Sequence, residues 1–176
     1  NNISQIYDAK GDYETALKYL QQSLKITQQI GDKSGEGTTL NNLSQIYDAK
    51  GDYETALKYL QQSLKIRQQI GDKRGMIATL HNMAHIAKQN EDFQQAIDSF
   101  SQALQLAQET QRPYDIFDEL RDLGILLCQL GNKEQGLPLL QQAHRLGQQV
   151  SIPGTEDIAQ YIAHFSGSGT AQNIKP

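Results

Sequence analysis

The sequence predicts an all-α protein in which antiparallel helix pairs stack one on the next, and three observations predict this fold class. Residues 1–40 and 41–80 match at 34 of 40 positions, because they differ only at 3/43, 27/67, 34/74, 36/76, 37/77 and 38/78. Apolar residues recur in each repeat at helical spacing, and glycine–aspartate pairs separate the apolar stretches. A fixed period of roughly 20 to 50 residues is typical of a solenoid, in which each unit buries its apolar face against its neighbours.

The second repeat shows the helix pair most clearly. The apolar stripe of its first helix consists of Leu40, Leu43, Ile46 and Tyr47. We expect this helix to end before Gly51, which can adopt the left-handed conformation, and Asp52 to cap the next helix. A second apolar stripe runs through residues 53–70. Two helices joined by so short a turn must lie antiparallel.

The same pattern continues with changed residues to about residue 150 and predicts four units, a cap and a tail. We expect unit 1 at 1–36, unit 2 at 37–76, unit 3 at 77–116, the divergent unit 4 at 117–152, a capping helix at 153–165 and a flexible tail at 166–176. Unit 1 is truncated at its start, because the turn 37–40 has no counterpart before Asn1. We therefore expect the chain to be a fragment of a longer array.

Composition excludes several classes of function. The net charge is −4, and 16 lysines and arginines are scattered among 20 acidic residues. No basic stripe exists to neutralise a phosphate backbone, so nucleic acid is not an expected partner. No apolar run approaches the roughly 20 residues that cross a bilayer, so no membrane association is expected. The single cysteine, Cys128, excludes an intrachain disulfide and fits a cytoplasmic protein.

The residues around each turn resemble the tetratricopeptide repeat family, in a variant with a 40-residue period. In unit 2 the resemblance rests on Leu43, Ser44, Tyr47, Gly51, Asp52, Tyr53, Ala56, Leu60 and Ser63. It covers residues 1 to about 150 and implies a right-handed superhelical array. The usual period of the family is shorter by six residues, and we expect the extra length to extend the second helix and its loop over Gln68–Gly75. In unit 4, Gly136 replaces the alanine of the motif, which predicts looser packing.

The resemblance also implies that the first helices of the pairs line a concave groove. The side chains on these helices that packing does not use are the candidate partner-binding residues. They are Asn2, Gln5, Asn41, Asn42, Gln45, Asp48, His81, Asn82, His85, Lys88, Arg121 and Asp122. Lys88 and Arg121 are the only cations on this face and do not repeat, so a clamp for a terminal carboxylate is not expected.

A row of asparagines at positions 2, 42 and 82, followed by Asp122, recurs with the period. An amide offers both a donor and an acceptor, so such a row can bind the backbone of an extended peptide. It is similar to the asparagine ladder of the O-linked N-acetylglucosamine transferase. In the alternative interpretation, these asparagines cap turns or bond to neighbouring helices and hold the array together.

No pattern in the sequence predicts a catalytic set, a cofactor or a metal. His81 and His85 have the spacing of two zinc ligands on a helix, but the sequence between them lacks the glutamate of a zinc protease. A third ligand would have to come from Asp48, Asp122 or Cys128. We expect the two histidines to contact a partner or solvent, and Cys128 to be a packing residue.

The sequence thus predicts a non-enzymatic scaffold that binds a peptide or helical segment of a partner protein. Two alternatives stay open. The chain could be the regulatory or sensor module of a larger signalling enzyme, or it could self-associate as a homo-oligomer through the ends of the array.

Overall fold

The computed structural model describes residues 12–167, and these residues form helices joined by short turns. The helices are α2 (Tyr13–Gln29), α3 (Lys33–Ala49), α4 (Tyr53–Gln69), α5 (Lys73–Gln89), α6 (Phe93–Glu109), α7 (Pro113–Gln129), α8 (Lys133–Val150) and α9 (Thr155–Ser166). Contacts divide the chain into two units, with the boundary inside α6 between Ser99 and Phe100. The predicted all-α solenoid of helix pairs is confirmed.

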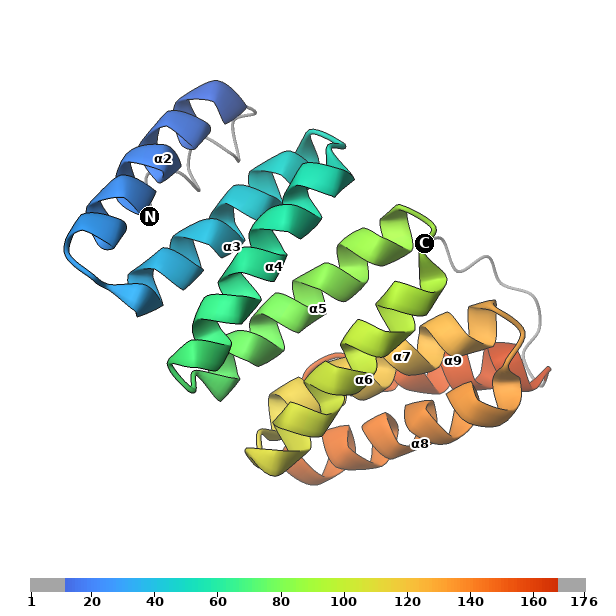
Figure 1. Ribbon diagram of the computed structural model, residues 1–176. Helices are drawn as coiled ribbons and strands as arrows, with labels where there is room; N and C mark the ends of the chain where they lie inside the picture. The colour runs from blue at the N-terminus through green and yellow to red at the C-terminus, as the bar shows by residue number, and fades with distance from the viewer. Residues whose placement is uncertain (1–11, 168–176) are drawn as a thin grey trace. The chain divides into compact units, whose positions relative to one another are not determined.

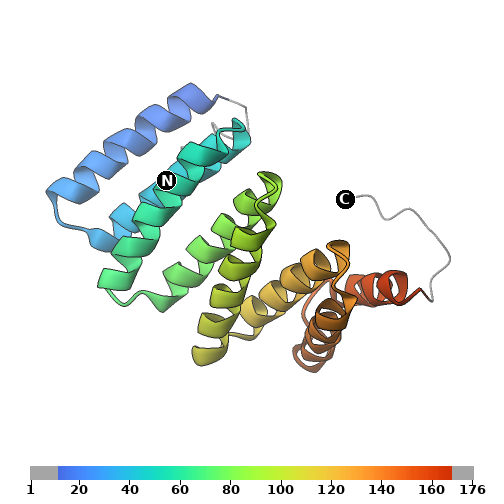
Figure 2. The same cartoon turned by 45° about the vertical axis from the view of Figure 1, so that its right-hand side comes forward.

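In the first unit, consecutive helices pack side by side in alternating directions (Figures 1 and 2). The core between α2, α3 and α4 is formed by Ala16, Leu20, Leu40, Leu43 and Ile46, with Tyr13, Leu17, Leu24, Tyr59 and Ile66 packed against them. The predicted stripe of α3 is therefore the buried one. α3 also contacts α5, so first helices of successive pairs are neighbours.

Aspartates begin the helices of the first unit. The side chain of Asp72 accepts a hydrogen bond of 2.9 Å from the backbone N–H of Gly75, and Asp52 caps α4 in the same way through Thr55. The preceding Gly51 and Gly71 have φ values of 75° and 69°, which favour glycine. The cap at Asp72 starts α5 at Lys73, so the expected extension over Gln68–Gly75 is wrong. α4 ends at Gln69, and only three residues separate it from α5.

The second unit contains α7, α8 and α9. Its core is formed by Phe117, Leu120, Cys128, Leu140, Ala143, Ile152 and Ile158. The C-terminal capping helix predicted with the fold class is α9, whose Ile158 is fully buried. A Cβ added to Gly136 would lie 2.5 Å from Cys128 Sγ and 2.7 Å from the backbone oxygen of Gly124. The expectation of looser packing here is wrong, because the glycine lets α7 and α8 approach more closely.

Candidate binding site

The candidate residues of the first unit lie on α3 and α5, the first helices of two successive pairs. α3 carries Asn41, Asn42, Gln45 and Asp48, and α5 carries His81, Asn82, His85 and Lys88. Gln45 is exposed, whereas the asparagines and Asp48 are half-buried. Asn2 and Gln5 lie outside the described residues.

A side-chain hydrogen bond connects the two helices at this face. The Asn82 Nδ2 group donates to Asn41 Oδ1 over 3.1 Å. This amide pair crosses from one repeat to the next, as the alternative interpretation of the asparagine row expects. This hydrogen bond leaves further donor and acceptor groups on both side chains, because an amide has two N–H donors and a carbonyl with two lone pairs. Asn82 and Asn41 therefore hold neighbouring helices together and retain groups that another molecule can bind.

Asp48 lies further along α3, and one oxygen of its carboxylate lacks a hydrogen-bond donor within residues 12–167. Its Oδ1 atom is buried and has no hydrogen-bond partner among the described residues. Burial raises the pKa of the Asp48 carboxyl, and the charge of His85 partly opposes that rise. Because α3 contacts α5, an acid and an imidazole of the first unit lie near enough for their charges to interact.

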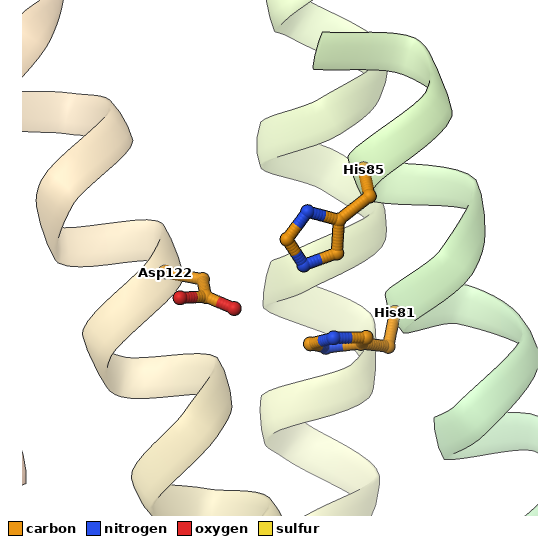
Figure 3. A group of neighbouring side chains, drawn as sticks. All are labelled: His81, His85 and Asp122. Atoms are coloured by element: carbon orange, nitrogen blue, oxygen red, sulfur yellow. The ribbon is translucent and has the colours of Figure 1, made fainter. Parts of the chain in front are cut away.

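His81 and His85 lie one helical turn apart on α5, and Figure 3 shows their rings next to each other. The ring centroids are 4.5 Å apart, with planes inclined at 60°. Asp48, the candidate third ligand in this unit, does not form a metal-binding group with them in the described part of the chain. Asp122 and Cys128, the other two candidates, belong to the second unit.

Arg121 and Asp122 lie on α7 and pair with each other. Arg121 Nε donates to Asp122 Oδ1 over 2.7 Å, and Arg121 Nη1 donates to Asp118 Oδ1 over 2.8 Å. Burial by itself lowers the pKa of the Arg121 guanidinium, but the bonds and charges of Asp122 and Asp118 outweigh burial and raise it. The guanidinium also lies over the Phe117 ring, 5.8 Å from its centroid. Arg121 is therefore held in place by its own helix.

Cys128 is part of the core of the second unit and is 3% exposed. Burial raises the pKa of its thiol, and the charge of Lys133 opposes this to a smaller extent. A raised pKa disfavours the thiolate, which is the nucleophilic form. The expectation that Cys128 is a packing residue is confirmed.

Two features of the structure were not predicted as candidate sites. Tyr47 on α3 stacks on Tyr59 of α4 with ring centroids 5.4 Å apart, and the Lys50 ammonium lies 5.7 Å from the Tyr47 centroid. In the second unit, α9 contributes polar side chains to a cavity that also involves Arg121. The only signal for this cavity in the sequence was the acidic first turn of α9, which is explained equally well by the helix dipole.

Comparison with solved structures shows the same fold in other proteins. BtubC (BKLC) from P. vanneervenii is 18% identical with a TM-score of 0.83, over 94% of this chain and 70% of that one. A putative kinesin light chain of Podosopora anserina with nearly identical TPR-like repeats is 17% identical with a TM-score of 0.79, over 95% and 83%. A Rap protein complexed with Competence and Sporulation Factor is 14% identical with a TM-score of 0.62, over 94% of this chain and half of that one.

Sequence comparison is more specific about the family. No curated protein sequence matches the chain. None of the described helices combines the length and the apolar character that crossing a membrane requires. The model of the tetratricopeptide repeat matches residues 1–69 and 75–149, which include the paired helices and turns described above. The chain belongs to the tetratricopeptide repeat family.

Proposed function

We propose that this chain is a non-enzymatic protein-interaction scaffold. It binds an extended or helical segment of a partner protein on the face of α3 and α5, which corresponds to the concave groove implied by the family. The residues at the centre of this site are Asn41, Asn42, Gln45, Asp48, His81, Asn82, His85 and Lys88.

One observation carries the proposal, the hydrogen bond between Asn82 and Asn41 across neighbouring first helices. The bond fixes two amides next to each other and leaves N–H donors on Asn41 and a carbonyl acceptor on Asn82. An extended peptide presents alternating N–H and C=O groups, and amides in this arrangement complement them whatever the side chains of the peptide. An amide pair that is already ordered loses little conformational entropy when the peptide binds.

The comparisons support an interaction role. The Rap protein whose fold this chain shares was solved with the Competence and Sporulation Factor bound to it. The family match covers both units. Stacked repeats present long continuous surfaces, which suit the binding of other proteins.

A random peptide library selected on the purified chain tests the proposal. The affinity of a selected peptide is then measured by calorimetry for the wild type and for Gln45→Ala and Asn82→Ala. Gln62→Ala is the matched control for Gln45→Ala, because both glutamines are exposed on helices and Gln62 lies on α4. We expect the two site variants to weaken binding about tenfold each, as lost interface hydrogen bonds do, and the control to leave it unchanged.

Circular dichroism melts confirm first that all variants are folded. Equal affinities for the wild type and both site variants would mean that the α3–α5 face does not bind the peptide. Equal weakening by Gln45→Ala and Gln62→Ala would assign the effect to the whole surface and would also contradict the proposal.

A second candidate function follows from the Rap comparison, because the matched region forms half of that longer chain. In this reading the repeats regulate a catalytic domain of the same protein. The reading frame of the complete gene tests it, since a catalytic domain encoded next to these repeats is the expected result. A gene that encodes repeats alone would rule this function out.

A further inference from the structure

The second unit contains a cavity between α7 and the first half of α9. Its volume is about 340 Å³, and it is lined by Arg121, Gly154, Asp157, Gln160 and Tyr161. This volume is at the lower end of the range for small-molecule pockets, roughly 300 to 1,000 Å³. The cavity belongs to the second unit alone and is therefore separate from the face of α3 and α5.

The charge of the cavity is negative, although an arginine lines it. All three nitrogens of the Arg121 guanidinium donate to carboxylates, Nη1 to Asp118 and Nε and Nη2 to Asp122, over 2.7–3.1 Å. Arg121 is thus paired with two carboxylates of its own helix, and the other charged residue that lines the cavity is Asp157. An anionic ligand would have to displace one of these carboxylates before it could pair with Arg121.

Asp157 contributes a carboxylate that is available to a ligand. Its backbone N–H donates to the Gly154 carbonyl over 3.2 Å, which starts α9. Its carboxylate forms no hydrogen bond or ion pair with any residue from 12 to 167. The side chain is exposed and lines the cavity, so it can accept hydrogen bonds there without breaking an existing contact.

Tyr161 and Gln160 complete the wall. The Tyr161 ring is stacked on Phe165 with centroids 6.5 Å apart and planes inclined at 16°, so the neighbouring ring supports it from one side. An aromatic face attracts a cation that lies within about 6 Å of its centroid. The exposed Gln160 amide supplies a carbonyl acceptor for an N–H donor.

We propose that this cavity binds a cationic side chain, the ammonium group of lysine or the guanidinium group of arginine, carried by a peptide segment of a partner protein. Asp157 pairs with the charge, the face of the Tyr161 ring attracts the cation, and the carboxylates around Arg121 add a favourable field. The site gives the scaffold a second contact, which selects basic segments in addition to the backbone contacts of the first unit.

Titration with blocked tripeptides tests the proposal. The probes are acetyl-Gly-X-Gly-amide with lysine, arginine, glutamine or glutamate as X, and binding is followed by the amide NMR shifts of the isotope-labelled chain. We expect the lysine and arginine probes to shift the amides of α9 and α7 saturably. The glutamine probe binds about tenfold more weakly because it lacks the charge-assisted bond, and the glutamate probe does not bind.

Matched variants localise the site. Asp157→Asn and Glu156→Gln each remove one negative charge from the first turn of α9, but only Asp157 lines the cavity. We expect Asp157→Asn to weaken the lysine probe about tenfold and Glu156→Gln to leave it within about twofold. Tyr161→Leu, which keeps an apolar wall, provides a second variant, and it is expected to weaken the lysine probe severalfold. Thermal melts establish that each variant is folded.

Three results would overturn the proposal. Equal weakening by Asp157→Asn and Glu156→Gln would mean that the probe responds to the overall surface charge of α9 and not to a contact with Asp157. Equal affinity for the lysine and glutamine probes would remove the role of charge. Butylamine binding as tightly as the lysine probe would assign the cavity to free amines instead of a peptide. Because all readouts come from α7 and α9, these results are independent of binding at the α3–α5 face.

Discussion

Arg67 is one of the few residues that differ between the two near-identical repeats, where its counterpart is Thr27. The arginine is 8% exposed. Its Nη1 pairs with Asp72 over 2.5 Å and its Nε donates to Ser63 over 3.2 Å. Its Nη2 reaches Thr38 on α3 over 3.3 Å. Arg67 thus connects α4 to Thr38 on α3 and to Asp72, which caps α5. A threonine at this position is too short to reach Thr38 or Asp72.

Replacing Arg67 by methionine is expected to lower the free energy of unfolding by ~2 kcal/mol, because the half-buried Asp72 loses its partner. Lys58→Met is the matched control. Its ion pair with Glu54 lies within α4, one helical turn apart, at 2.7 Å, and both side chains are largely exposed. We expect this control to change stability by less than ~0.5 kcal/mol.

Urea denaturation monitored by circular dichroism measures both variants. Raising the salt concentration provides a second check, since an exposed pair is screened more than a buried one. If Arg67→Met were as stable as Lys58→Met, the arginine network would contribute no more than a surface pair.

At the scale of elements, two buried glycines show how closely helices approach. Gly136 on α8 and Gly37 on α3 are both buried near the start of their helices. A Cβ on Gly136 would meet a backbone oxygen and a backbone nitrogen of α7 within 2.9 Å. A Cβ on Gly37 would meet nothing closer than the Arg67 side chain at 3.5 Å. Gly136 is therefore required by the contact of two helices, and Gly37 is not.

Substituting alanine at each position tests this difference. We expect Gly136→Ala to destabilise the protein by ~2 kcal/mol, because backbone atoms of α7 must move. Gly37→Ala is expected to be neutral or to stabilise by up to ~1 kcal/mol, since alanine favours the helix. Chemical denaturation curves of the two variants give both values. Equal stabilisation by both alanines would show that α7 and α8 separate without cost.

At the scale of the whole molecule, charge limits the classes of partner. The net charge is −4, and the sequence pI is about 5.5. Binding to DNA depends on cations that release counterions from phosphates. We expect no mobility shift of a DNA duplex by the chain at about 150 mM salt, even at ~100 μM protein. A shift that persists at this salt concentration would contradict the expectation that nucleic acid is not a partner.

The sequence was a good guide where local chemistry dominates. The glycine at 51 and the aspartate at 52 predicted where α3 ends and α4 begins, because left-handed backbone and a capping carboxylate are local requirements. The start of α5 was predicted wrongly, because Lys73 and Arg74 carry no apolar signal and the cap at Asp72 decides the boundary. The candidate residues on α3 and α5 were named from the sequence, and their binding role stays a prediction. The bond from Asn82 to Asn41 was not predicted.

The sequence by itself determined the class of the fold, the helix pairs and the family. These properties depend on periodicity, turn residues and composition, which are properties of the chain itself. Only the tertiary structure decided which polar atoms lie together: the two amides between α3 and α5, the Arg67 network, the close contact at Gly136 and the cavity beside α9. Such contacts depend on side-chain direction and helix separation to within about an ångström, which a repeat pattern does not specify.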